Sequence, residues 1–142
     1  MKKINGFTLI ELLISISIVA ILSVVLSVSF SNAQKNGRDQ RRIADLKAIQ
    51  SAAEQYYLLG VGGSYPANKT TPWSVNTQVV LQKFPVGPKG VGDTYSYFVS
   101  GGNYCACSNK METGKYGNAD QLNQAPCDFQ SVGTNYCVGN QQ

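Results

Sequence analysis

The chain has 142 residues, which is enough for one small domain and an appendage but not for two sizeable domains. It contains no histidine, which excludes a Ser-His-Asp triad and every His-ligated metal site, and we expect no enzyme activity. The formal charge is +4, but residues 60–142 hold five Lys and four acidic residues, so a general nucleic-acid-binding surface is not indicated.

The first long element is the apolar run at residues 7–30, in which Glu11 is the only charged residue. As a helix, this run would span ~36 Å at ~1.5 Å per residue, against a hydrocarbon core of ~30 Å. A secretory signal has a shorter apolar region of ~7–15 residues. A simple single-pass anchor does not explain a carboxylate, because at mid-membrane depth such a group costs ~2.5–3.5 kcal/mol. We therefore expect a membrane-spanning helix in which Glu11 has a role.

A basic leader, KKING at residues 2–6, precedes Phe7, and Glu11 lies four residues beyond Phe7. This order resembles the leader and mature N-terminus of type IV pilins and type II secretion pseudopilins. The resemblance implies that a prepilin peptidase cuts the leader, residues 1–6, between Gly6 and Phe7, and that the new N-terminus at Phe7 is methylated.

Glu11 has a physical role in that scheme, because the cut would create a cationic amine on Phe7 within an apolar setting. A buried ion pair is weak evidence for stability, but it can specify a register between chains. Our hypothesis is that Glu11 pairs with Phe7 of a neighbouring subunit and sets the axial register of a filament.

Small residues recur along the apolar run with a spacing near 3.5. Two interpretations stay open for this stripe. It can allow close packing of neighbouring helices, which we favour, or the serines can bond back to carbonyls of their own helix. The stripe consists of Ser17, Ala20, Ser23, Ser27 and Ser31.

Residues 31–59 continue with a helical pattern, and the glycines that begin at Gly60 end it. Gly37 is either a flexible joint or a tolerated surface residue, with about 1 kcal/mol lost relative to Ala. Basic residues between Lys35 and Lys47 either bind DNA or anionic headgroups or, as we favour, form a solvated helix face. The predicted apolar stripe is Ile43, Leu46, Ile49, Ala53, Tyr56 and Tyr57.

The remainder, residues 60–142, is expected to form a globular head. Strand-like stretches lie at residues 94–99, 104–106 and 136–138. We expect them to form a small antiparallel sheet packed on the C-terminal half of the long helix, so the predicted fold class is α+β.

Four cysteines, Cys105, Cys107, Cys127 and Cys137, lie in the last part of the head and suggest an oxidising compartment. A Cys105–Cys107 bond would be strained, which leaves two pairing schemes. We favour Cys105–Cys137 with Cys107–Cys127, because strands around 105 and 137 could lie antiparallel. A four-cysteine zinc site is the rival, but the chain has no CxxC knuckle. The resemblance supports bridges, since pilins often hold their C-terminal region this way.

The turn at residues 84–88, FPVGP, resembles the major pseudopilins, in which an Asp usually occupies the place of Gly87 and the head may bind calcium. In this chain the acidic residues Asp93, Asp120 and Asp128 are scattered. The sequence therefore supports no claim of a calcium site, and we expect no other metal and no cofactor.

The resemblance implies a structural subunit, expected to be the major one, of a type IV pilus-like or type II secretion pseudopilus-like filament. The alternative is a membrane-anchored minor pilin or a DNA-uptake protein. The implied partners are copies of the chain in a helical filament, the prepilin peptidase, an assembly platform protein with its ATPase, and the membrane, whereas a nucleic acid is not expected.

The expected location is the bacterial cytoplasmic membrane, in a single pass with the N-terminus inside, and then the cell surface or an extracellular filament after assembly. More Lys and Arg residues follow the apolar run than precede it, which alone would favour the opposite orientation. The leader motif and the cysteines of the head outweigh that signal.

Overall fold

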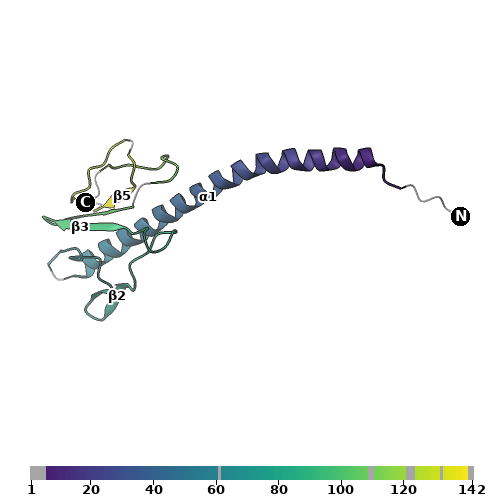
Figure 1. Cartoon of the computed structure of the whole chain (residues 1–142). Helices are drawn as coiled ribbons and strands as arrows, with labels where there is room; N and C mark the ends of the chain where they lie inside the picture. The colour runs from purple at the N-terminus through teal and green to yellow at the C-terminus, as the bar shows by residue number, and fades with distance from the viewer. Residues whose placement is uncertain (1–5, 61, 109–110, 121–123, 132, 141–142) are drawn as a thin grey trace. The chain divides into compact units, whose positions relative to one another are not determined.

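The computed structural model describes residues 6–60, 62–108, 111–120, 124–131 and 133–140. One long helix and five short strands make up its regular structure (Figure 1), which confirms the predicted α+β class. The chain divides into two compact units, residues 1–34 and 35–142. In chain order the elements are α1 (Leu9–Leu59), β1 (Trp73–Val75), β2 (Gln78–Leu81), β3 (Ser96–Ser100), β4 (Asn103–Cys107) and β5 (Cys137–Gly139).

The first unit consists mainly of the N-terminal part of α1. Every side chain that the structure describes between residues 6 and 34 is exposed, although most of them are apolar. This part of α1 is long enough and apolar enough to cross a membrane. The hydroxyls of Ser17, Ser23 and Ser27 each donate to a carbonyl four residues earlier, at 2.8 Å. In the single chain, three of the four serines of the small-residue stripe thus bond back to their own helix.

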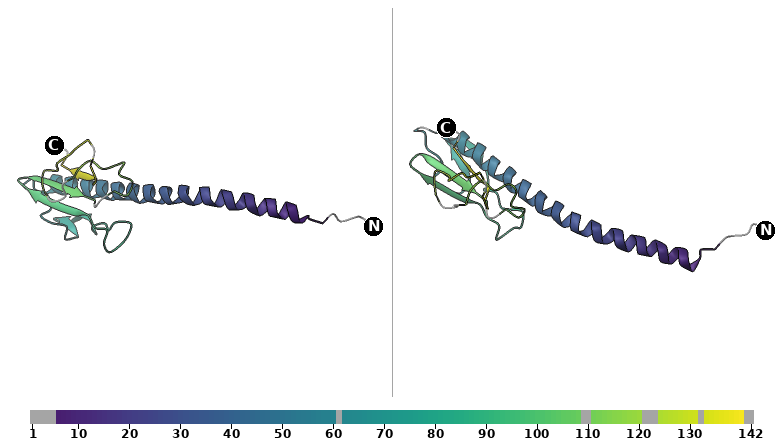
Figure 2. Two further views of the ribbon diagram at one scale, coloured as in Figure 1. Left: turned by 45° about the horizontal axis from the view of Figure 1, so that its top comes forward. Right: turned by 90° about the horizontal axis from the view of Figure 1, so that it is seen from above.

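The second unit has its core between the C-terminal half of α1 and the sheet that contains β3 and β5 (Figures 1 and 2). Leu46, Ile49 and Ala53 are fully buried, as the apolar stripe predicts. The helix runs without interruption through Gly37. From the sheet side and the adjoining loops, the core receives Tyr65, Trp73, Tyr95, Tyr97, Tyr104, Ala106 and Val138.

The main sheet has the order β3-β4-β5, and both pairings are antiparallel. The three strands lie within one or two residues of the predicted stretches. Successive side chains of a strand point to opposite faces. On β4, Tyr104 and Ala106 accordingly join the core against α1, whereas Cys105 and Cys107 join a second buried cluster with Ala119. The sheet therefore separates an aromatic core from a disulfide core.

The hairpin of β1 and β2 was not predicted. Its strands are joined by a short loop in which Asn76 adopts a positive φ of 54°. Asn tolerates this left-handed conformation better than most residues do, and such positions are typical of tight hairpin turns. The strands are too short for the alternation of apolar residues to reveal them.

Candidate processing and assembly site

The proposed cleavage point lies in a non-helical segment just before α1. Gly6 and Phe7 are both exposed, and Phe7 is 84% exposed. Apart from its neighbours in the chain, no atom crowds Gly6: a Cβ built on it would meet nothing within 4 Å. An exposed bond outside the helix is one that a peptidase can reach without unwinding α1.

Thr8 and Glu11 form a capping box at the start of α1. The Thr8 hydroxyl and backbone N–H both donate to Glu11 Oε2, at 2.7 and 2.9 Å. In return, the Glu11 N–H donates to the Thr8 hydroxyl at 3.3 Å. These bonds satisfy backbone donors that the first helical turn leaves without partners. The role of Thr8 was missed in the sequence, although a Thr-x-x-Glu pattern before an apolar run is the signal for it.

The capping box shows what holds the Glu11 carboxylate in the intact single chain. Its partners belong to Thr8, on the same chain, one helical turn away. The negatively charged carboxylate of Glu11 also interacts favourably with the positive N-terminal end of the helix dipole. The pairing of Glu11 with Phe7 of a neighbouring subunit stays a prediction.

A group of six charged side chains, here called the ion cluster, ties α1 to two loops of the head. Arg42 of α1 lies at its centre and is 2% exposed. Its guanidinium contacts Asp93 before β3 at 2.7 Å, Asp39 on the same helix at 2.9 Å and Glu112 after β4 at 3.1 Å. The other members, Arg38 and Lys89, contact Glu112 at 2.8 and 3.2 Å. Three acids thus balance three bases, as buried charges require.

The ion cluster corrects the expectation of a solvated basic face between Lys35 and Lys47. Arg42 is buried, and Arg38 forms a bidentate ion pair with Glu112. Arg41 and Lys47, by contrast, are exposed. The sequence could not show this, because two of the three acids that neutralise the arginines, Asp93 and Glu112, lie more than 50 residues away along the chain.

Hydrogen bonds lower the pKa of two carboxylates of the ion cluster, Asp39 and Glu112. Burial alone would raise the pKa of Asp39, but donors from Glu112, Thr113 and Arg42 more than offset it, and the net pKa is lowered. The pKa of Glu112 falls to about 2, mainly because Arg38 donates to both of its oxygens, while burial acts in the opposite direction.

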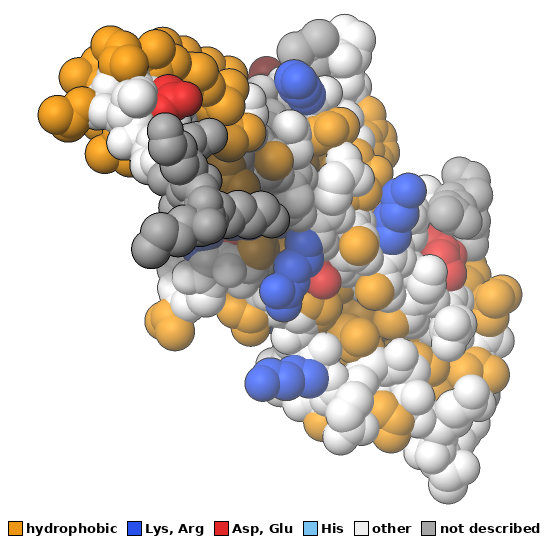
Figure 3. Space-filling model, turned by 90° about the vertical axis from the view of Figure 1, so that its right-hand side faces the viewer, with side chains coloured by type: hydrophobic (Ala, Val, Ile, Leu, Met, Phe, Trp, Pro, Cys, Tyr) orange, Lys and Arg blue, Asp and Glu red, His pale blue; other side chains and the backbone are white. Residues whose placement is uncertain are grey.

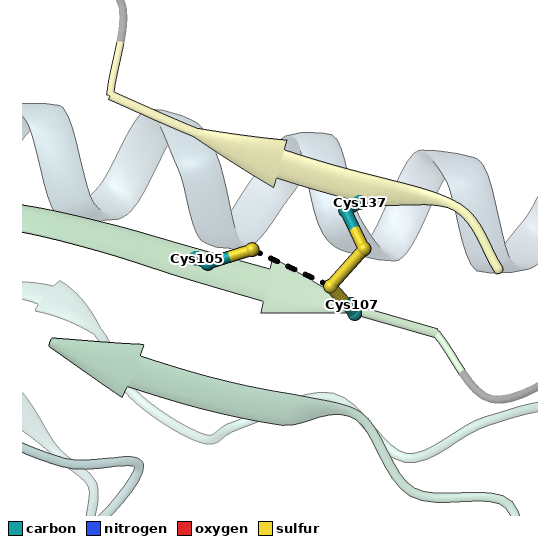
Figure 4. A group of neighbouring side chains, drawn as sticks. All are labelled: Cys105, Cys107 and Cys137. Atoms are coloured by element: carbon teal, nitrogen blue, oxygen red, sulfur yellow. Dashed lines mark hydrogen bonds between the residues drawn. A yellow bond between two sulfur atoms is a disulfide. The ribbon is translucent and has the colours of Figure 1, made fainter. Parts of the chain in front are cut away.

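The structure pairs Cys105 with Cys127 and Cys107 with Cys137, so the favoured pairing is wrong. Strands β4 and β5 are antiparallel as expected, but Cys137 lies opposite Cys107, and Gly139 lies opposite Cys105. A shift of two residues in register therefore exchanges the partners. Figure 4 shows Cys105 and Cys107 projecting from the same face of β4, with the Cys107–Cys137 bridge between strands.

One group of possible metal ligands gathers within the described part of the chain, and it consists of Cys105, Cys107 and Cys137. Cys105 Sγ and Cys107 Sγ are 3.4 Å apart, the contact drawn as a dashed line in Figure 4. All three sulfurs belong to disulfides, whereas zinc is bound by thiolates. Of the acids considered for calcium, Asp93 is held by Arg42, and Asp120 accepts a hydrogen bond from the backbone of Thr134.

Residues 1–27 match a family model described as the prokaryotic N-terminal methylation motif. This motif is the signature of type IV pilins and type II secretion pseudopilins. The long N-terminal helix with small antiparallel sheets is the pilin-like architecture. The motif points to a structural subunit rather than an enzyme, and with the apolar helix it fits membrane anchoring and a surface filament. Comparisons with curated proteins and with solved structures found no match.

Proposed function

We propose that the chain is a structural subunit of a type IV pilus-like or type II secretion pseudopilus-like filament, and that it is the major subunit. The observation that carries the proposal is the methylation motif at residues 1–27 leading into a helical segment whose described apolar side chains are all exposed. Such a surface is stable only in lipid or against other apolar helices. A membrane before assembly and a bundle of copies after it meet this requirement in turn.

The first step of the proposed pathway is removal of residues 1–6. A prepilin peptidase hydrolyses the bond between Gly6 and Phe7, and the new Phe7 amine is methylated. The exposed, non-helical position of both residues supports this step. Thr8 then becomes the second residue of the mature chain and retains the capping of α1 by Glu11.

The second step is assembly, for which a platform protein and a cytoplasmic ATPase are the proposed partners. Neighbouring copies pack their apolar helices together, with Glu11 of one copy facing the Phe7 amine of another. A carboxylate between apolar helices is strongly disfavoured unless it meets a cation. Only the register that joins the two groups satisfies both, so the pair selects one axial offset between subunits.

The test is electron microscopy of sheared surface material together with N-terminal sequencing. We expect filaments whose subunit begins with methylated Phe7. A Gly6→Val variant should keep Met1 and form no filaments, and Glu11→Ala should be cut and inserted but fail to polymerise. Glu11→Asp, which keeps the charge, is the matched control for Glu11→Ala. Abundant filaments from Glu11→Ala, or native material that begins at Met1, would contradict the proposal.

The role as the major subunit has its own test. Antibodies against the head should decorate the whole length of each filament if this chain is the main repeating unit. Decoration confined to a filament end would instead favour a minor subunit.

A further inference from the structure

The exposed charges of the head are separated along the chain. Residues 55–92 contain three Lys and no acidic residue, whereas residues 116–142 contain Asp120, Asp128 and no Lys or Arg. Both aspartates are exposed, and so are Lys69 and Lys83. Within the described residues, none of these four side chains takes part in an ion pair. One segment of the head therefore presents negative charge to its surroundings, and another presents positive charge.

The two aspartates lie at paired positions of neighbouring segments. An antiparallel bridge joins Ala119 to Phe129, and this register sets Asp120 opposite Asp128. Side chains at such positions are close neighbours, and like charges there are destabilising. Phe129, which follows Asp128, is 56% exposed. Asp120, Asp128 and Phe129 are here called the acidic surface.

Lys69 and Lys83 flank a hydrogen bond beside the hairpin of β1 and β2. The Phe84 N–H donates to the Thr71 hydroxyl at 3.3 Å, and so holds the segment after β2 against the segment before β1. Lys83 directly precedes Phe84. Lys69 lies two residues before Thr71. Val79 of β2 is 48% exposed, and Lys69, Lys83 and Val79 are here called the basic surface.

The two surfaces belong to opposite sides of the main sheet. The segment of the basic surface joins the aromatic core through Trp73, whose ring packs on Tyr97 of β3 with centroids 5.1 Å apart. The segment of the acidic surface joins the disulfide core, on the other face, through Ala119. Figure 1 shows the C-terminal segment above β3 and β2 below it. In Figure 3, the lower end of the head shows basic and apolar side chains but no acidic ones.

We infer that the acidic surface of one copy docks on the basic surface of the next copy in the filament. This inference rests on the proposed function and specifies the contact between heads within it. A second copy is the occupant that fits, because it brings two lysines that relieve the repulsion between Asp120 and Asp128. Within one chain the two surfaces cannot meet, because the sheet lies between them.

The difference between the two surfaces fits a filament better than a dimer. A contact between unlike surfaces is heterologous, and its repetition generates a ring or an open helical filament, whereas a closed dimer needs a self-complementary surface. Opposite charges across such a contact select the partner and fix the register. The exposed side chains of Phe129 and Val79 supply apolar area to the same contact.

The first test links carboxylates to amines in filaments of the unmodified full chain. A water-soluble carbodiimide activates a carboxylate, the lysine amine then attacks the acyl carbon to form an amide, and the carbodiimide leaves as a urea. Mass spectrometry should find Lys69 or Lys83 linked to Asp120 or Asp128, and denaturing gels should show a ladder of linked copies. Single chains in detergent should give no such link. Filaments that lack the link would overturn the inference.

The second test reverses the charges of one surface and then of both. Asp120→Lys/Asp128→Lys places like charges across the contact and should lower the yield of sheared filaments about tenfold or more. Lys69→Asp/Lys83→Asp should do the same. The chain with all four substitutions has opposite charges at every contact again, so its yield should return to near the parental level. A misfolded head would not be repaired in this way, and a chain that stays defective would overturn the inference.

A matched control separates the contact from a general effect of charge. Lys83→Asp alone should lower the filament yield about threefold. Lys115→Asp makes the same change at an exposed lysine outside the basic surface and should leave the yield unchanged. Equal losses in the two variants would overturn the inference.

Two further outcomes identify what has failed. If EDTA dissolved the filaments, Ca²⁺ restored them and Lys69→Asp/Lys83→Asp had no effect, a metal ion would occupy the aspartate pair, and the inference would be overturned. Normal filaments that lack the link and tolerate both double reversals contradict this inference alone. An unmodified chain that forms no filaments contradicts the proposed function, and with it this inference.

Discussion

Arg42 donates a buried hydrogen bond of 2.7 Å to Asp93 and thereby joins the long helix to the loop before β3. The same guanidinium contacts Asp39 and Glu112, so one side chain holds three acids. Removing one partner from a buried ion group leaves an uncompensated charge, which costs about 3–5 kcal/mol. The fold of the head should therefore depend strongly on Arg42.

Arg42→Met should lower the free energy of unfolding by about 3–5 kcal/mol, because Asp39 and Asp93 would remain buried without their cation. The measurement is urea unfolding in detergent, followed by the fluorescence of Trp73, the single tryptophan, which is 3% exposed. Arg41→Met, at an exposed position, should change the stability by less than about 0.5 kcal/mol. Arg42→Lys should restore part of the loss, and an Arg42→Met variant as stable as the parent would contradict the role of the ion cluster.

The stability of the head should fall in acid because of Glu112. Its pKa is lowered from 4.5 to about 2 in the folded chain, so the stabilisation is present above pH 4.5 and is lost as the pH falls toward 2. The lowered pKa of Asp39 acts in the same direction. After discounting for solvent screening, Glu112 contributes about 2 kcal/mol.

Glu112→Gln should flatten this acid dependence by about 2 kcal/mol while lowering the stability at neutral pH. The check is the same urea titration repeated at several pH values between neutrality and strong acid. Asp128→Asn, at an exposed position, is the matched control and should leave the curve unchanged. A full acid dependence in Glu112→Gln would show that another group is responsible.

The disulfide pairing can be tested with double variants. Cys105→Ser/Cys127→Ser leaves Cys107 and Cys137, which the structure pairs, so the folded protein should contain no free thiol. Cys105→Ser/Cys137→Ser leaves two cysteines that belong to different bridges and should expose two thiols to a thiol reagent. The Cys105–Cys127 bridge joins residues that are 22 positions apart in the chain. Its removal should lower the free energy of unfolding by about 3 kcal/mol. The opposite pattern of thiols would restore the pairing first favoured.

The capping box predicts a local effect at Thr8. Valine has the same shape as threonine but lacks the hydroxyl that donates to Glu11. In Thr8→Val, the first turn of α1 should therefore be less stable by about 1 kcal/mol. Amide hydrogen exchange of the first helical turn should then be about fivefold faster. Thr8→Ser keeps the hydroxyl and should exchange at the parental rate. Equal exchange in the valine and serine variants would mean that the capping box does not stabilise this end.

Gly87 is held close to Asp93. Its N–H donates to the Asp93 carbonyl at 2.7 Å, and a Cβ on Gly87 would lie 2.5 Å from that carbonyl oxygen. Gly87→Ala should therefore destabilise the head by about 1–3 kcal/mol, measured by the Trp73 unfolding assay. Gly92→Ala, where a Cβ meets nothing within 4 Å, should be nearly neutral. If both variants were neutral, the loop would be able to yield without loss.

Several features of this protein follow from the sequence alone because they depend on neighbours in the chain. The apolar run with Glu11, the helical stripe that contains Leu46 and Ile49, and three strands are local patterns. A helix or strand repeats every few residues, so its period is visible in a single stretch. The methylation motif at residues 1–27 is also a local pattern, because it lies within one continuous stretch of the chain.

Only the tertiary structure decided which cysteines pair and which charges are buried. Cys137 meets Cys107 because of the register of β5 on β4, and a strand can shift by two residues without changing its inward and outward faces. Arg42 is neutralised by Asp93, which is 51 residues away along the chain. Such contacts depend on how separate elements pack together, and no period in the sequence records that arrangement.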